Sequence, residues 1–342
     1  MNRKDRVLEA VRASGYDALI AIKPENVFYL TSHYGRGPLL LKEGLCRLYA
    51  KPIDFDLAVD EAKGCEVVEV EDAYAELLKD VRGLKACLDV LDQRLLPFIG
   101  KGITFDPAPI YSCRKVKEES EVEKVKRAAG LLDELFSLAF DVIEVGKTED
   151  EVMAELVKLA VERGSGFSYG PKPFIVASGP ASAYPHAFKG RRIGRGEFVI
   201  VDVYLKLDGY FADATRTFHT GNLSEEEEDV YYSVLEAQEE AIKEVREGKS
   251  CGELDGLARR YLRSKGYEQF FVHALGHGVG LEVHEPPWLR KGSKDVLERG
   301  NTITVEPGVY VKGKFGVRIE DTVLVRDGAK PLTKFTKEPL IV

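Results

Sequence analysis

The first third of the chain alternates segments of extended and of helical periodicity. Residues 1–11 have the spacing of an amphipathic helix. After it, apolar runs of strand length alternate with helical spacing, so we expect strands at residues 17–22, 65–71 and 85–91 and helices at 72–81 and 93–100. This alternation is typical of a small α/β domain, which we expect to occupy residues 1–112. The junction at residues 106–120 is only a proline-containing turn followed by charge, so one continuous domain is the alternative.

A different pattern then occurs twice, namely two helices followed by a pair of strands. Each helix is expected to begin at a Ser or Thr that is followed three residues later by Glu, which is the capping-box spacing. These pairs are Ser120 with Glu123, Thr148 with Glu151, Ser224 with Glu227, and Ser250 with Glu253. Glycines after the apolar stripes predict that the first helix ends before Gly146, the second near Gly164 and the third at Gly248.

The strand pairs cover residues 198–205 with 210–218, and residues 301–311 with 315–325. The two halves share this layout without a repeat in the sequence itself. The pattern predicts an α+β domain over residues 113–342, in which four helices with pseudo-twofold symmetry back a curved antiparallel sheet.

Two aspartates lie on the arms of the first strand pair. If residues 208–209, an Asp-Gly dipeptide, form a type I′ turn, Asp202 lies opposite Thr215, and Tyr204 lies opposite Asp213. Asp202 and Asp213 then share one face as diagonal neighbours, roughly 7 Å apart. Because the flanking sequence is apolar, two carboxylates there require a cation or a proton. The pattern indicates a shared metal site, and the alternative is a solvated acidic face.

The second strand pair also carries two carboxylates within apolar sequence, Glu306 and Glu320. A three-residue loop centred on Gly313 would place them directly opposite one another, whereas a two-residue turn would not. Pro307 is expected to bend the strand just after Glu306. Taken alone, this pair is weaker evidence for a site than the aspartates are.

Histidines concentrate between the two strand pairs. His273, His277 and His284 stand among glycines, and His186 precedes the first strand pair. A neutral imidazole is a common ligand of transition metals, and glycines allow close approach of the backbone to a site. A single loop histidine is usually structural, but three within one short segment beside acidic strands favour a site.

The combined set of two Asp, two Glu and one His can hold two divalent ions. Oxygen-rich ligands with one imidazole favour Mn²⁺ or Co²⁺, or Zn²⁺ by substitution. Such a pair of ions activates water and polarises a carbonyl, which is the chemistry of hydrolysis. The sequence contains no GxSxG motif and no phosphate-binding loop that would compete with this reading.

Composition and charge exclude several other functions. The chain has 49 basic and 57 acidic residues, and the formal charge of −8 has the wrong sign for binding nucleic acid. No apolar run approaches the roughly 20 residues that span a bilayer, so we expect neither a membrane segment nor a secretion signal. The five cysteines are scattered, odd in number and without a CxxC pair, as in a reducing compartment. We therefore expect a cytoplasmic protein.

Four segments carry the resemblance to a known family: DVYLKLDGYFADATRTF, HALGHGVGLEVHEPP, TITVEPGVY and VRIEDTVLV. In this order and spacing they resemble the pita-bread metallopeptidases (family M24), specifically the proline-specific branch that contains prolidase (Xaa-Pro dipeptidase) and aminopeptidase P. The resemblance covers about residues 115–342. Residues 1–112 resemble the creatinase-like amino-terminal domain of that branch more loosely, through ENVFYLTS.

The resemblance implies a role for each matching metal ligand. Asp202 would bind one metal ion, and Asp213 and Glu320 would bridge both ions. His277 and Glu306 would complete the second site. A bridging hydroxide would attack the scissile carbonyl, and Glu306 would carry the proton.

Further residues match the substrate side of the family's site. His186 and His284 match histidines that hold the substrate and stabilise the tetrahedral intermediate, and His273 matches another near the substrate pocket. Arg318 matches an arginine of the proline-specific branch. Thr215 is expected to support the ligands from behind. Tyr204 departs from the family, which more often has a small residue there, and would narrow the pocket.

The sequence thus predicts a dinuclear peptidase that cleaves Xaa-Pro bonds in small peptides, most simply a dipeptidase, with aminopeptidase P as the alternative. Methionine aminopeptidase is disfavoured by the amino-terminal domain and by Arg318. Creatinase-type chemistry does not retain the metal ligands, and a peptide-binding module without activity generally loses at least one. His284 and Trp288 could form a wall for the proline ring, although Trp288 could equally be a core residue. The family resemblance also implies a homodimer.

Overall fold

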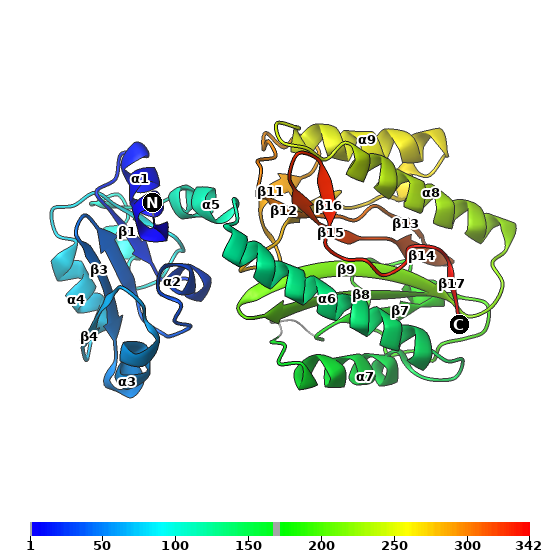
Figure 1. The fold of residues 1–342 in the computed structure, drawn as a ribbon, viewed down its shortest axis with the longest axis horizontal. Helices are drawn as coiled ribbons and strands as arrows, with labels where there is room; N and C mark the ends of the chain where they lie inside the picture. The colour runs from blue at the N-terminus through cyan, green and yellow to red at the C-terminus, as the bar shows by residue number, and fades with distance from the viewer. Residues whose placement is uncertain (1, 167–171) are drawn as a thin grey trace. The chain divides into compact units, whose positions relative to one another are not determined.

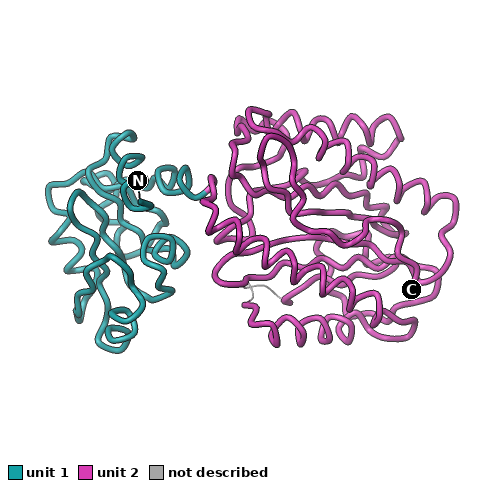
Figure 2. Tube along the Cα trace, in the orientation of Figure 1, with its two compact units in different colours: residues 1–114 teal, residues 115–342 magenta. Residues whose placement is uncertain are grey.

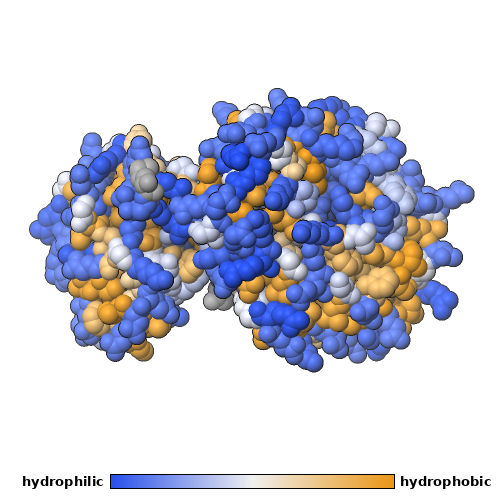
Figure 3. Space-filling model, viewed as in Figure 1, coloured by the Kyte–Doolittle hydropathy of each residue, from blue (hydrophilic) through white to orange (hydrophobic). Residues whose placement is uncertain are grey.

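The computed structural model describes residues 2–166 and 172–342. The chain divides into two compact units, Met1–Arg114 and Lys115–Val342, which Figure 2 shows in different colours. Within the described residues, no helix is long and apolar enough to cross a membrane. On the face drawn in Figure 3, hydrophilic residues predominate and apolar residues form separate patches between them.

Unit 1 contains a six-stranded mixed sheet in the order β4-β3-β2-β1-β5-β6. One of its apolar clusters joins the sheet to α4 through Ala73 and Leu77. Along the chain the elements are α1 (Arg3–Ala13), β1 (Ala18–Ala21), α2 (Pro24–Thr31), β2 (Leu39–Lys42), β3 (Leu45–Ala50), α3 (Pro52–Glu61), β4 (Glu66–Glu69), α4 (Ala73–Asp80), β5 (Ala86–Leu88), the 3₁₀ helix η1 (Leu96–Phe98), β6 (Ile103–Phe105) and α5 (Ala108–Arg114).

Unit 2 repeats one layout, two helices followed by strands. Its first half contains α6 (Glu119–Val142), α7 (Glu149–Glu162), β7 (Ile175–Ser178), η2 (Gly179–Ala181), β8 (Phe198–Leu207) and β9 (Tyr210–His219). Its second half contains α8 (Glu225–Lys243), α9 (Cys251–Ser264), η3 (Glu268–Phe270), β10 (Gly276–Gly278), β11 (Glu285–Leu289), β12 (Thr302–Val305), β13 (Gly308–Val311), β14 (Phe315–Arg318), β15 (Asp321–Val325), β16 (Ala329–Pro331) and β17 (Leu340–Ile341).

The described strands of unit 2 form three sheets that carry the site. One has the order β17-β9-β8-β7, one has the order β11-β10-β12-β15-β16, and β13 pairs with β14. Helix α6 packs on β8 and β9, and α8 and α9 lie side by side (Figure 1). The apolar faces of α8 and α9 form a core with β12 to β15, through buried residues such as Val234, Leu254 and Ile303. This agrees with the predicted α+β layout.

The first predicted hairpin is confirmed in detail. Strands β8 and β9 pair antiparallel, with Asp202 opposite Thr215 and Tyr204 opposite Asp213. Asp208 and Gly209 have φ angles of +49° and +86°, as a type I′ turn requires at both central positions. The Asp-Gly turn therefore sets the register that puts both aspartates on one face.

Of the two turns that the sequence left open, the second hairpin has the three-residue loop, but the hairpin is split in the middle. Val311 pairs with Phe315 around the loop, and farther along Val305 pairs with Asp321, in the same register. Between these ladders, the amides of Glu306 and Glu320 donate instead to Leu275 and Thr215 carbonyls, at 2.8 and 3.1 Å. Both glutamates therefore stand where the hairpin opens.

Three predictions about helices are wrong: the start of one, the end of another and the extent of a third. The cap of α6 is Glu118 with Glu121, not Ser120 with Glu123, because the Lys117 amide is already bound to the Gly300 carbonyl at 3.0 Å and the helix begins just after it. Helix α8 ends at Lys243 rather than at Gly248, whose amide instead bonds Leu297. The helix expected at residues 93–100 is only η1, since Pro97 lacks the amide that would continue it.

The other helix starts agree with the sequence. Thr148 and Ser224 cap α7 and α8 with full capping boxes. Ser250 caps α9 by accepting a hydrogen bond from the Glu253 amide.

Candidate metal centre

One cavity of unit 2 collects nearly all of the predicted site residues. It has a volume of about 470 Å³. Of the ten residues predicted from the sequence, nine line it: His186, Asp202, Asp213, His273, His277, His284, Glu306, Arg318 and Glu320. Thr215, the tenth, lies fully buried behind them.

The candidate metal ligands around this cavity come from different sheets. Asp202 and Asp213 come from β8 and β9, and His277 comes from the centre of β10. The isolated bridge between Thr215 and Glu320 joins β9 to the opening of the split hairpin. Because the ladder is interrupted there, the Glu306 and Glu320 side chains meet the aspartates instead of lying along a continuous strand.

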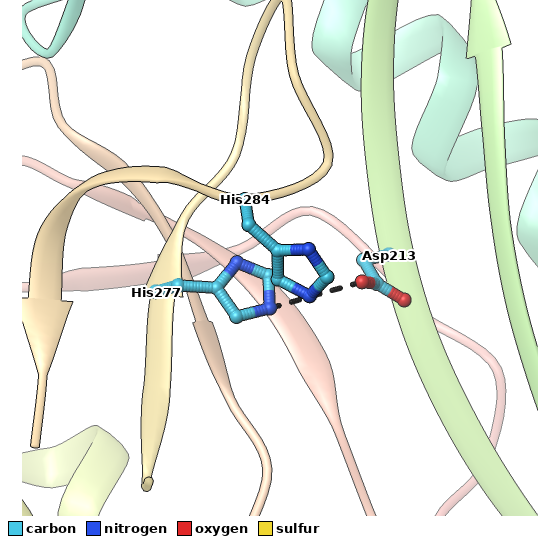
Figure 4. A group of neighbouring side chains, drawn as sticks. All are labelled: Asp213, His277 and His284. Atoms are coloured by element: carbon cyan, nitrogen blue, oxygen red, sulfur yellow. Dashed lines mark ion pairs between the residues drawn. The ribbon is translucent and has the colours of Figure 1, made fainter. Parts of the chain in front are cut away.

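The side chains form overlapping groups with the spacing of metal ligands. In each of three triads, one potential ligand atom from every member lies within 4.8 Å of the others. The triads are Asp202 with Asp213 and Glu320, His277 with Glu306 and Glu320, and Asp213 with His277 and His284. Figure 4 shows the last of these, with the His277 ring directed at Asp213.

His277 presents a free ring nitrogen to the carboxylates. Its Nδ1 lies 3.0 Å from the Gly278 carbonyl, and since a carbonyl only accepts, this contact assigns the proton to Nδ1. Nε2 then faces Glu306 Oε1 at 3.3 Å and Asp213 Oδ2 at 3.9 Å. Burial lowers the pKa of His277 to about 4. The imidazole is therefore neutral, as a metal ligand must be.

The cavity holds more carboxylates than the nearby cation, Arg318, can neutralise. Burial, and then the other carboxylates, raise the pKa values of Asp213 and Glu320 well above their usual range. Burial raises the pKa of Glu306 to about 8. Asp213 Oδ1 and Glu320 Oε1 are buried without a hydrogen-bond partner. Divalent cations among these oxygens would neutralise the excess negative charge and would coordinate the oxygens that lack a hydrogen bond. The residues therefore fit a metal centre.

Arg318 connects several side chains at the cavity. Its guanidinium donates to Asp202 Oδ2 at 2.5 Å, to the Tyr310 hydroxyl at 2.7 Å and to Thr215 Oγ1 at 3.0 Å. The Thr215 hydroxyl in turn donates to Glu320 Oε2 at 2.7 Å. The Tyr310 oxygen also lies 2.9 Å from His273 Nε2. This hydrogen-bond network thus holds one candidate metal ligand from each hairpin, Asp202 and Glu320.

The sequence reasoning missed Tyr310. The residue is buried, and it lies directly opposite Gly316 in the β13–β14 pair. A Cβ on Gly308 or Gly316 would approach Tyr310 atoms to 2.6 and 2.8 Å. Two glycines near an aromatic residue, one on each strand of the hairpin, were therefore an available signal of a tightly accommodated ring.

Comparison with known proteins places the chain in a family. The pattern of Metallopeptidase family M24 matches residues 123–327, and that of the Creatinase/Prolidase N-terminal domain matches residues 3–135. Xaa-Pro dipeptidase of Pyrococcus furiosus is 34% identical over 352 residues, covering 99% of each chain. The chain belongs to metallopeptidase family M24. As a member of that family, this M24 peptidase is a metal-dependent hydrolase, and its buried acidic cluster is where divalent metal ions fit.

Solved structures similar to this M24 peptidase include enzymes of two names. Xaa-Pro dipeptidase from Bacillus anthracis is 32% identical and superposes with a TM-score of 0.92, covering 99% of each chain. X-Pro aminopeptidase from Thermotoga maritima is 31% identical and superposes with a TM-score of 0.89, covering all of each chain. The pita-bread fold with a creatinase-type amino-terminal unit is thereby confirmed.

Proposed function

We propose that this M24 peptidase hydrolyses Xaa-Pro dipeptides. The observation that carries the proposal is a cavity with three buried carboxylates, a fourth that is partly buried, and a neutral histidine, in a chain that matches an Xaa-Pro dipeptidase along its whole length. The cavity of about 470 Å³ lies at the small end of ligand pockets. This size suits a short peptide.

Five side chains would hold the metal ions. Asp202 would bind one ion, Asp213 and Glu320 would bridge two, and His277 with Glu306 would complete the second position. The oxygen-rich set favours Mn²⁺ or Co²⁺, with Zn²⁺ as a substitute. Bound there, such ions supply an activated water and a polarised carbonyl.

The remaining side chains would handle the substrate and the proton. Glu306 lies beside His277 and faces the cavity, so it would carry the proton to the leaving imide nitrogen. His284 and His186, both exposed at the cavity, would hold the scissile carbonyl and stabilise its developing charge. Arg318 and His273 would position the substrate from the Tyr310 side.

An apolar wall suits the proline ring. Proline offers no N–H, and its ring fixes φ, so the subsite needs shape rather than hydrogen bonds. Trp288, Val283 and Phe188 line the cavity together with His284. Trp288 therefore belongs to the cavity wall and not to the core alone. Tyr204 lines the same cavity and occupies space that a small residue would leave open.

We further propose a cytoplasmic homodimer. The support for the cytoplasmic location is the set of five free cysteines, two of them buried. The support for the dimer is the family resemblance.

Hydrolysis of Met-Pro, Met-Pro-Gly and Met-Ala tests the proposal, each assayed after EDTA treatment and again after addition of Mn²⁺ or Co²⁺. Metal-restored cleavage of Met-Pro alone is the expected result. Metal-restored cleavage of Met-Pro-Gly would instead identify an aminopeptidase P activity, which the similarity to the Thermotoga maritima structure makes the second candidate. Cleavage of none of the three would contradict the proposal.

A further inference from the structure

Two cysteines stand side by side at the edge of the unit 1 sheet. Strands β3 and β4 pair in parallel, with Arg47 opposite Glu66. One position earlier on each segment stand Cys46 and Cys65, so the register places them next to one another on one face. Neighbouring strands lie about 4.8 Å apart, which is within the Cα separation of about 4.4–6.8 Å that a disulfide requires. Both thiols are free and half-buried.

A lysine is fixed beside this pair. Lys4 Nζ donates to the Lys63 carbonyl at 2.8 Å and also to the Gly64 carbonyl, directly before Cys65. Cys46, which is only partly buried, and Lys4 both line a surface depression of about 500 Å³. The neighbouring Cys65 thiol lowers the pKa of Cys46 against the effect of burial, with help from the Lys4 charge, whereas the pKa of Cys65 is raised.

The other cysteines lack this arrangement. Cys87 and Cys251 are fully buried, and burial raises the pKa of each to about 12. Cys113 is half-buried, and its pKa is also raised by burial. Its thiol lies 4.0 Å from the Ser112 hydroxyl, and within residues 2–166 and 172–342 the groups that shift its pKa include no other cysteine. Cys113 therefore provides a matched comparison within the same unit.

We propose that Cys46 and Cys65 form a thiol–disulfide exchange site, which the disulfide of a small thiol such as glutathione converts into an intramolecular disulfide. The Cys46 thiolate attacks one sulfur of the small disulfide, forms a mixed disulfide and releases one small thiolate. The Cys65 sulfur then displaces the second small thiolate from Cys46. The cysteine pair loses two electrons and two protons, and the small disulfide leaves as two thiols, so the exchange balances.

The new bond would close the chain from Cys46 to Cys65 into a covalent loop that contains α3. Such a loop restricts the unfolded chain, so oxidation is expected to stabilise unit 1. The site lies within unit 1, and it is independent of the peptidase activity proposed for unit 2. The observable consequences are a lost pair of thiols and a higher urea midpoint for unit 1.

Incubation of the native full-length protein with oxidised glutathione tests the proposal. After alkylation and proteolysis, mass spectrometry should find the Cys46 and Cys65 peptides joined within one chain, while Cys113 stays alkylated. Cys65→Ser should instead accumulate glutathione on Cys46. Cys113→Ser, the matched control, should behave as the unaltered protein does.

The role of the lysine is tested by Lys4→Met, which should slow glutathione capture by Cys46 several-fold without changing the final product. Failure of the native protein to form the Cys46–Cys65 bond would overturn the proposal. It would also be overturned if glutathione in Cys65→Ser appeared on Cys113 rather than on Cys46. Both results are read from the folded protein and need no peptidase assay.

Discussion

A buried ion pair fixes the turn that carries His284, and its removal should be costly. Lys117 Nζ lies 2.8 Å from Glu285 Oε1, and both side chains are 1% exposed. Glu285 Oε2 accepts the Glu282 amide at 3.2 Å. A Cβ on Gly280 would come within 3.0 Å of both partners, so the turn packs directly against the pair. Lys117→Met is expected to leave the Glu285 carboxylate buried without its cation.

Breaking a buried pair in this way costs about 3–5 kcal/mol. With a urea dependence of about 3 kcal/mol per M, the unfolding midpoint should fall by roughly 1–2 M. The assay is urea denaturation followed by tryptophan fluorescence. Trp288 is the only tryptophan of the chain, and it lies in β11 with Glu285, so the signal reports on unit 2.

Two further variants decide whether the buried charge is the cause. Lys115→Met removes a lysine from a more exposed pair, 26% and 46% exposed, with Glu298 at 2.5 Å, and should cost less than about 1 kcal/mol. Adding Glu285→Gln to Lys117→Met should recover more than half of the loss, because the amide keeps its acceptor but carries no charge. A loss for Lys117→Met no larger than for Lys115→Met, or a double variant as unstable as the single one, would refute this reasoning.

Three other outcomes are expected. His284→Ala should retain its full metal content by mass spectrometry but lower kcat/KM by about 10²–10³; loss of metal would assign His284 to the ligands. Thr215→Val removes the hydroxyl between Arg318 and Glu320 and should weaken metal affinity by about 10–100-fold in a calorimetric titration; unchanged affinity would count against this support. Burial raises the pKa of Asp89 in unit 1 to about 6, so the folded state holds its proton more tightly than the unfolded chain, whose Asp pKa is about 3.9. The free energy of unfolding should therefore fall by about 3 kcal/mol as the pH rises from about 4 to about 6. Urea unfolding followed by circular dichroism should show this fall in the native protein and not in Asp89→Asn.

The parts of the site that rest on local rules were predictable. The Asp208-Gly209 turn has two positive φ angles, which few other dipeptides tolerate, so the register of β8 and β9 followed from the sequence. The loop around Gly313 was not decided by the sequence, because a two-residue turn fitted the pattern as well as the three-residue loop that forms. The roles assigned to the individual side chains stay predictions.

Other features depend on contacts that are distant in the sequence. The opening of the second hairpin depends on Leu275 and Thr215 carbonyls that bind the glutamate amides. No local rule predicts those partners. The same holds for Tyr310, whose position depends on Arg318 and His273, and for the end of α8, where Leu297 binds the amide of Gly248.

The central claim is that the acidic cluster of unit 2 holds two catalytic metal ions. The most direct measurement is calorimetric titration of the metal-free protein with Co²⁺, followed by Met-Pro hydrolysis on the same samples. We expect two equivalents per chain and activity that rises with them. Asp213→Asn should lose at least one equivalent and the activity, whereas Asp208→Asn, at the half-exposed turn of the same hairpin, should match the unaltered protein. Met-Pro hydrolysis that persists without metal, or Co²⁺ binding that Asp213→Asn leaves unchanged, would contradict the claim.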